Sequence, residues 1–261
     1  MPMDQTPPSL PGAASPSQSS LIGRMMNVFA SPVEVFDDVK HGPARVTNWL
    51  VPVALVVSVT IASFALIFSQ PAVQQQVREM QEKILDQQVA AGKIKPEQAK
   101  QAKEFFDNMP PWVLQIVGIV QGVISGFFSA LWWALVVWLI GSKKFKAGVS
   151  FGKALEASGL SMMIFVLGIV VTTLLVLIFG DINTRPALSV VLGPFDPMSK
   201  LHLLAGAMNL FYLWFTTVLA LALSRLGGVS FGKAALWLFG VWTASRLLLV
   251  GVGVGMGGFV L

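Results

Sequence analysis

Five stretches of this chain are too long and too apolar to form the core of a water-soluble domain. They cover residues 49–69, 112–141, 160–179, 203–223 and 235–256. A helix of about 20 apolar residues crosses the ~30 Å hydrocarbon layer of a bilayer, and each stretch reaches that length. Only 12% of the residues are charged, about half of the ~25% typical of globular domains. The sequence therefore predicts an all-α membrane protein with five transmembrane helices.

Several classes of function are excluded by what the chain lacks. It contains no cysteine, which rules out disulfides, thiolate metal sites and cysteine nucleophiles. His41 precedes the first span and His202 opens the fourth, so no metal-ligand pair is evident. The net charge is +5, but the basic residues are scattered around apolar segments, which does not indicate nucleic-acid binding. The spans show no intramembrane-protease or Walker signature. We expect no enzymatic activity, no metal, no cofactor and no nucleic-acid partner.

The N-terminal region divides into two parts. Residues 1–20 hold five Pro and five Ser and read as a disordered tail, because they have too little apolar surface to fold. Residues 21–48 are amphipathic and predict two short helices that meet at Ala30 and Ser31. A capping box from Ser31 to Glu34 and Pro32 at the first helical position would begin the second helix.

This amphipathic segment has two possible environments. It either lies on the bilayer surface, with Phe29 and Phe36 as contacts to lipid or to a partner, or it packs on the bundle without touching lipid.

Residues 70–111 form the one sizeable polar loop between spans. Six basic residues balance six acidic ones, and Val73, Val77, Met80 and Ile84 form one apolar helical stripe. Gly92 suits the end of one helix and Pro96 the start of the next. We expect a helical hairpin outside the bilayer, whose stripe packs on itself or on the spans, or binds a partner.

The second stretch is longer than a span requires. It tilts, extends beyond the bilayer, or breaks near its glycines. Gly118, Gly122 and Gly126 share one face at four-residue spacing, which lets another helix approach closely in lipid. This face predicts helix packing, and a homo-oligomer is compatible with it.

A heptapeptide, Gly-Val-Ser-Phe-Gly-Lys-Ala, occurs at residues 148–154 and again at 228–234. Because two spans separate the copies, both lie on the same membrane face, and spans two–three and four–five would be hairpins related by a pseudo-two-fold axis. The serines can cap the following helices, and the lysines favour anionic lipid. The alternative is a pair of ordinary turns at the membrane boundary. The candidate lipid or partner contacts in the copies are Ser150, Phe151, Lys153, Ser230, Phe231 and Lys233.

Three polar residues within the spans are candidates for a transport path or for contacts between helices: Arg246, Asn209 and Gln121. Arg246 lies midway along the fifth stretch, where a charge is costly and is by default a functional candidate. It would meet Asn209 or Asp181, or reach an interface if the span is displaced.

The orientation follows from the lysines of the short loops. Lys143, Lys144 and Lys146 directly follow the second stretch, and basic residues near span ends favour the cytoplasmic side. We expect a multi-pass protein of the bacterial cytoplasmic membrane, with its N-terminus in the cytoplasm and its C-terminus outside.

The amphipathic segment carries a motif that resembles a known family. Residues 27–36 read Asn-Val-Phe-Ala-Ser-Pro-Val-Glu-Val-Phe, and Gly42-Pro43, Trp49 and Pro52 follow. With five spans and the Ser-Phe-x-x-Ala elements at 150–154 and 230–234, this pattern resembles the bacterial branch of the Yip domain family of Ypt/Rab-interacting membrane proteins. The resemblance covers residues 25–256 and implies a cytosolic N-terminus and no catalytic residues.

Eukaryotic members of that family act in vesicle trafficking and bind prenylated Rab GTPases. Residues 38–43 depart from their Asp-Leu-Tyr-Gly-Pro motif by lacking the Tyr and having an additional residue, so Rab binding is not carried over. We expect residues 49–256 to form a Yip-like membrane domain that organises membrane or recruits a partner. The alternative is a small transporter or channel built from spans two to five.

Overall fold

The computed structural model describes residues 19–193, 195–196 and 199–251. Most of the predicted disordered tail and the glycine-rich end beyond residue 251 lie outside the described residues. Apart from one isolated antiparallel bridge, Ala187 to Asn209, the regular structure of the described part is helical. The helices are α1 (Leu21–Ala30), α2 (Pro32–His41), α3 (Thr47–Phe68), α4 (Pro71–Ala90), α5 (Pro96–Asp107), α6 (Pro111–Trp138), η1 (Leu139–Lys144), α7 (Phe151–Ser161), α8 (Met163–Phe179), η2 (Leu188–Leu192), α9 (Lys200–Ala207), α10 (Leu210–Gly227) and α11 (Phe231–Gly251).

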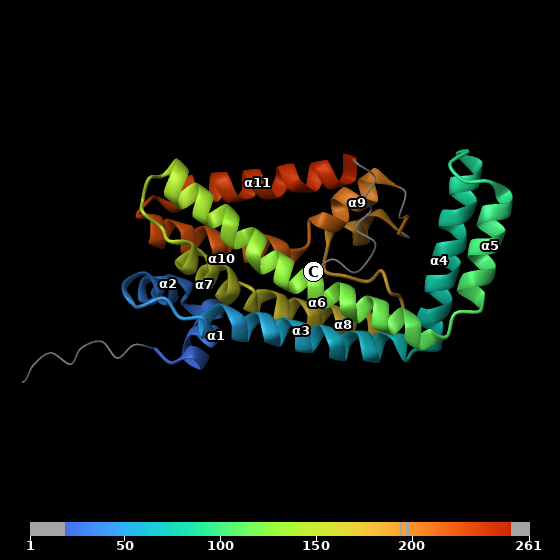
Figure 1. The fold of residues 1–261 in the computed structure, drawn as a ribbon, viewed down its shortest axis with the longest axis horizontal. Helices are drawn as coiled ribbons and strands as arrows, with labels where there is room; N and C mark the ends of the chain where they lie inside the picture. Colours follow the sequence, from blue (N-terminus) through green and yellow to red (C-terminus); the bar gives the residue numbers. More distant parts are fainter. Residues whose placement is uncertain (1–18, 194, 197–198, 252–261) are drawn as a thin grey trace, which may run out of the picture.

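Five helical segments are long and apolar enough to cross a membrane, which confirms the predicted fold class. They are Thr47–Phe68, Gln115–Lys144, Phe151–Phe179, Leu210–Gly227 and Phe231–Gly251. In Figure 1 they run along the long axis of the molecule, with α1 and α2 at one end. The α4–α5 hairpin stands at the opposite end (Figure 1), outside the spans as predicted. The pseudo-two-fold relation between the hairpins of spans remains a prediction.

The spans differ from the predicted ranges at three places. The third begins at Phe151, nine residues before residue 160, so that Lys153 and Glu156 lie within it. The fourth begins at Leu210 because the chain leaves helical geometry at Met208 and Asn209, and the residues before it form the separate helix α9. The described part of the fifth span ends at Gly251.

The second span does not break at its glycines. Helix α6 continues through all of them and changes to a π-helix only at Leu139–Lys144. The glycines are covered by α3: a Cβ on Gly118 would lie 2.4 Å from Phe64 Cε1, and one on Gly122 would lie 2.6 Å from Thr60 Cγ2. The absence of side chains at these glycines therefore allows α6 to pack closely against α3. Because the helix is continuous, the face that carries the glycines stays straight.

The N-caps of α1, α2 and α7 follow the sequence only in part. Ser150 accepts a hydrogen bond from the Lys153 amide and caps α7, and Ser20 accepts one from Gly23 and caps α1. The predicted capping box at Ser31 is wrong. Helices α1 and α2 do meet there and Pro32 is the first residue of α2, but the Ser31 side chain makes no capping hydrogen bond. Its φ of −136° and ψ of 57° are outside the extended range that an N-cap usually adopts.

Candidate functional site

The apolar face of α1 and α2 is covered by the helix bundle. Val28, Phe36 and Val39 are fully or almost fully buried, and α2 packs against α10 while α1 packs against α7. The Phe29 ring meets the Trp214 ring edge-on at 5.9 Å. Of the two environments considered for this segment, packing on the bundle therefore accounts for Phe29 and Phe36.

A cluster of charged and polar side chains, three of them buried and two partly exposed, lies where α1 and α2 meet the bundle. We call it the buried polar cluster; its members are Arg24, Asp38, Asn48, Lys153 and Glu156. Glu156 is 1% exposed, and one of its carboxylate oxygens accepts a hydrogen bond from the Asn48 amide. Arg24, 2% exposed, donates to Asn48 Oδ1 at 3.4 Å. Asn48 thus links α1, α3 and α7 through one side chain.

Two ion pairs neutralise this cluster. Lys153 Nζ lies 3.4 Å from Glu156 Oε1, and Arg24 Nε lies 4.0 Å from Asp38 Oδ2. Lys153 Nζ also donates to the carbonyl oxygens of Val39 and Gly42, which end α2. Buried charges need such partners, because an unpaired one is costly to desolvate. The cluster therefore fastens both short helices to the bundle.

Sequence reasoning missed Glu156 and misjudged the surroundings of Lys153. The signal was present: Glu156 is the single acid between Asp107 and Asp181, and it follows Lys153 by three residues. That spacing places the two side chains on one face of a helix. Lys153 was expected to reach anionic lipid, but its side chain is 16% exposed and bends inward to α2 and Glu156.

A third ion pair joins α2 to α10 at the surface. Arg225 Nε donates to Asp37 Oδ1 at 2.7 Å, and the guanidinium contacts the other carboxylate oxygen as well. The hydrogen bond and the charge of Arg225 hold the pKa of Asp37 below its ordinary value, although partial burial acts in the opposite direction. Residues 188 positions apart in sequence are held together by this bidentate contact.

The serines and phenylalanines of the repeated heptapeptide are exposed at the same end of the molecule, as is Lys233. Phe151 and Phe231 are 41% and 43% exposed, and Phe151 meets Trp138 edge-on at 6.2 Å. The carbonyl oxygen of Ser230 accepts from the Lys233 and Ala234 amides at the start of α11. Ser230, Lys233 and Phe231 are thus available to lipid or partner, and their predicted role as contacts remains a prediction.

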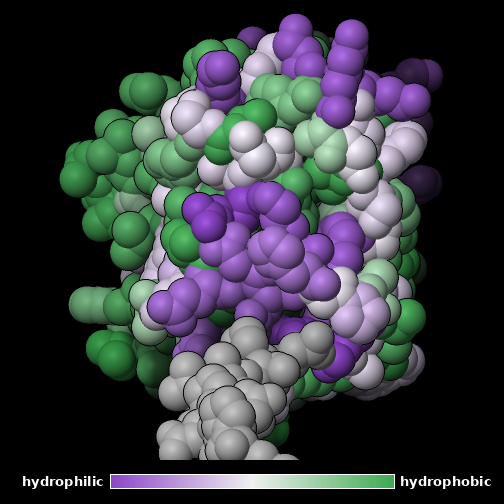
Figure 2. Space-filling view, turned by 90° about the vertical axis from the view of Figure 1, so that its left-hand side faces the viewer, coloured by the Kyte–Doolittle hydropathy of each residue, from purple (hydrophilic) through white to green (hydrophobic). Residues whose placement is uncertain are grey.

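The positive charge of the described chain is concentrated at the end that bears α1 and α2. Figure 2 shows hydrophilic residues gathered across the centre of this end and hydrophobic residues along its sides. The end carries nine basic residues against four acidic ones, whereas the rest of the described chain carries nine basic and eight acidic ones, Arg246 of α11 included. The nine are Arg24, Lys40, Arg45, Lys143, Lys144, Lys146, Lys153, Arg225 and Lys233, and the four are Glu34, Asp37, Asp38 and Glu156.

The three polar residues predicted within the spans do not line one path. Asn209 precedes α10 and caps it, accepting from the Phe211 amide at 2.8 Å. Gln121 lies on an exposed part of α6. The Arg246 guanidinium lies over the Tyr212 ring of α10, 4.8 Å from its centre, a cation–π contact. Arg246 therefore contacts the first turn of α10, which Asn209 caps, while Gln121 lies on an exposed surface of α6.

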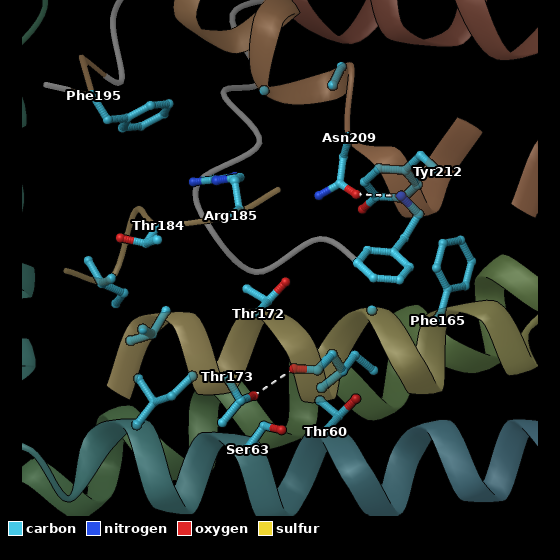
Figure 3. A pocket seen from close by; sticks show the side chains of 18 of the residues that line it. Thr60, Ser63, Phe165, Thr172, Thr173, Thr184, Arg185, Phe195, Asn209 and Tyr212 are labelled. Atoms are coloured by element: carbon cyan, nitrogen blue, oxygen red, sulfur yellow. Dashed lines mark hydrogen bonds between the residues drawn. The ribbon is translucent and has the colours of Figure 1, made fainter. Parts of the chain in front are cut away.

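A cavity of about 160 Å³ lies at the end of the bundle opposite α1 and α2. Its walls come from the second half of α3, most of the length of α8, the segment 182–185, α9 and the first turn of α10. Figure 3 shows Arg185 above the cavity and Thr172 rising toward it from α8. Arg185 was not among the residues predicted from the sequence, because nothing in its neighbourhood in sequence indicates a cavity.

The comparisons with known proteins give one match. The family model described as the Yip1 domain matches residues 26–253, from α1 to the end of the last span. No curated protein and no solved structure matches the chain.

Proposed function

Because this chain belongs to the Yip1 domain family, whose model covers nearly all of it, we propose that it is a non-enzymatic membrane protein that recruits an acidic partner protein. The recruiting surface is the basic end that bears α1 and α2. The observation that carries the proposal is the excess of basic side chains at this end, beside exposed apolar side chains of α1. Charged surfaces of this kind steer oppositely charged partners.

The same excess supports a cytoplasmic position for this end. Basic residues close to span ends are retained on the cytoplasmic side, and the rest of the described chain is nearly balanced in charge. With five spans, the N-terminus is then cytoplasmic, and the α4–α5 hairpin and the C-terminus lie outside.

The surface offered to a partner is a rigid one. The buried polar cluster and the Asp37–Arg225 pair hold α1 and α2 on the bundle. Ile22 and Met26 of α1 are 73% and 61% exposed, so an apolar patch accompanies the charges. Apolar groups of this size contribute affinity when a partner covers them, while the charges contribute selectivity.

The proposal is tested by crosslinking in native membranes. A variant with Lys40→Glu, Lys143→Glu and Lys233→Glu reverses three exposed charges at the basic end. A control with Lys93→Glu, Lys95→Glu and Lys100→Glu makes the same change in net charge on the hairpin. We expect proteins that crosslink to the wild type to be lost only from the first variant. Equal recovery with both variants would refute recruitment through the basic end.

The alternative, a small transporter, predicts solute flux through purified protein in liposomes. The separation of Gln121 from Asn209 and Arg246 weighs against a shared polar path. Flux that Arg246→Leu abolishes would favour the transporter over recruitment.

A further inference from the structure

We propose that the cavity opposite α1 and α2 binds an anionic phospholipid, with the phosphate facing Arg185 and part of an acyl chain between α3 and α8. This site is separate from the recruiting surface and does not depend on the function proposed for that surface.

Arg185 is the cation of this site, and its guanidinium is held in place by neighbouring groups. Arg185 Nη2 is buried and has no hydrogen-bond partner among the described residues. Arg185 Nε donates to the Asn183 carbonyl at 3.3 Å, and the guanidinium lies 5.2 Å from the centre of the Phe195 ring. These contacts fix the group but leave a donor free. A buried donor without a partner is costly, and an anionic oxygen would satisfy it.

The surroundings of Arg185 hold no paired carboxylate. Among the described residues, no acidic oxygen lies within ion-pair distance of its guanidinium. Burial lowers the pKa of Arg185, although the charge of Asp181 opposes that effect in part. A guanidinium remains protonated in proteins even so, and it forms short bidentate hydrogen bonds with phosphate.

The remaining lining suits an amphiphile better than a free ion. Near Arg185 the cavity carries hydroxyl groups from Thr172 and Thr184, which Figure 3 shows on opposite walls. Further along, Ile67, Ile169 and Val176 make the lining apolar. A phosphate with an attached chain matches this change from polar to apolar, as ligand sites generally combine a few polar groups with an apolar lining.

The cavity also lies beside surface that faces lipid. Helix η2 exposes Val190 and Val191 at 62% and 74%, and α9 exposes Leu201 at 63%. These two helices pack on each other, and α9 encloses the cavity together with the spans. Exposed apolar residues next to span ends are expected in the membrane interface. A phospholipid can therefore reach the site from the bilayer, whereas a soluble anion would cross apolar surface.

The test measures which lipid stays with the purified full-length protein. Protein is reconstituted with equimolar dioleoyl phosphatidylglycerol and dioleoyl phosphatidylcholine, re-purified in mild detergent, and its retained lipid is quantified by mass spectrometry. We expect phosphatidylglycerol to be enriched on the wild type. Arg185→Gln should reduce that enrichment at least about tenfold, the effect of one charged hydrogen bond. The control Lys200→Gln removes an exposed charge of α9 outside the cavity and should leave the enrichment unchanged.

A second variant keeps the charge and fills the space. Thr172→Phe should also remove the enrichment. Folding of both variants is judged by helical circular dichroism and elution volume, and if Arg185→Gln does not fold, Thr172→Phe alone tests the proposal. Equal enrichment on the wild type and on the folded variants would overturn the proposal, as would equal retention of both lipids by the wild type. Displacement of the lipid by millimolar inorganic phosphate would show a site for a free anion and overturn the assignment to lipid.

Discussion

Glu156 is a carboxylate buried among apolar helices, and its partners come from three parts of the chain. It contacts Asn48 of α3 and Lys153 of its own helix, and Lys153 in turn binds the carbonyl oxygens that end α2. A buried ion pair of this kind contributes little net stability compared with apolar packing, but the loss of one partner leaves the other charge buried and unpaired. At the residue scale, the attachment of the recruiting surface depends on this arrangement.

Glu156→Gln should therefore destabilise the protein strongly. It leaves the Lys153 ammonium without its counter-charge, and breaking a buried pair costs about 3–5 kcal/mol. The measurement is the unfolding midpoint of the purified protein in mild detergent, followed by tryptophan fluorescence. Glu104→Gln, which removes an exposed acid of α5, is the control and should leave the midpoint unchanged. An unchanged midpoint for Glu156→Gln would show that the cluster does not hold the helices.

The Asp37–Arg225 pair should make stability depend on pH in one direction. Because Arg225 lowers the pKa of Asp37 below 3.8 in the folded protein, the pair stabilises the fold above that ordinary value. The contribution is lost as pH falls through the lower, folded value. Asp37→Asn should thus be less stable than wild type at about pH 6, and the difference should disappear as pH falls through the lowered, folded pKa of Asp37. Asp107→Asn, which removes an exposed acid of α5, is the control. A difference in stability between Asp37→Asn and wild type that persists at the lowest pH would contradict the assignment.

At the scale of elements, the backbones of α3 and α7 approach closely where the two helices cross. A Cβ on Gly159 would lie 2.3 Å from Trp49 Cα and 3.0 Å from its carbonyl oxygen. Because these are backbone atoms, no side-chain rotation can relieve the overlap. The glycine therefore sets the distance between the helices that carry Asn48 and Glu156, and so the geometry of the buried polar cluster.

Gly159→Ala should force α3 and α7 apart and destabilise the protein by about 1–3 kcal/mol, the usual cost of overpacking. Gly240→Ala is the matched control, because a Cβ there meets nothing within 4 Å in the middle of α11. The control should be unchanged or slightly more stable, since Ala favours a helix over Gly. Unfolding midpoints in detergent distinguish the two, and equal midpoints would mean that the crossing is not limited by this contact.

At the scale of the whole molecule, the two ends differ in charge and in what they present. One end carries the basic excess and the short helices, and the other carries the balanced hairpin and the cavity with Arg185. The two proposed contacts, an acidic partner protein and an anionic phospholipid, therefore lie at opposite ends of the molecule.

The orientation can be measured because the chain contains no cysteine. Gln101→Cys places a thiol on the hairpin and Lys233→Cys places one at the start of α11, both at exposed positions. A membrane-impermeant maleimide added to intact cells should label only Gln101→Cys, and permeabilisation should make Lys233→Cys reactive. The reverse pattern would place the N-terminus outside and refute recruitment on the cytoplasmic side.

The sequence by itself determined the five spans, the extramembrane hairpin and the two short N-terminal helices. These features follow from local patterns: long apolar runs, a four-residue stripe, and Pro or Gly at helix ends. Helix ends were less certain where such signals conflicted, as at Asn209, which reads as part of an apolar run but caps α10.

Only the tertiary structure decided which polar groups meet. Glu156 and Asn48 are 108 residues apart, and no local pattern relates them. The inward turn of Lys153, the contact of Arg246 with Tyr212 and the free donor of Arg185 likewise depend on where distant helices cross. The physical reason is that burial and pairing of charge are properties of the packed bundle, whereas hydrophobic length and helical period belong to each segment alone.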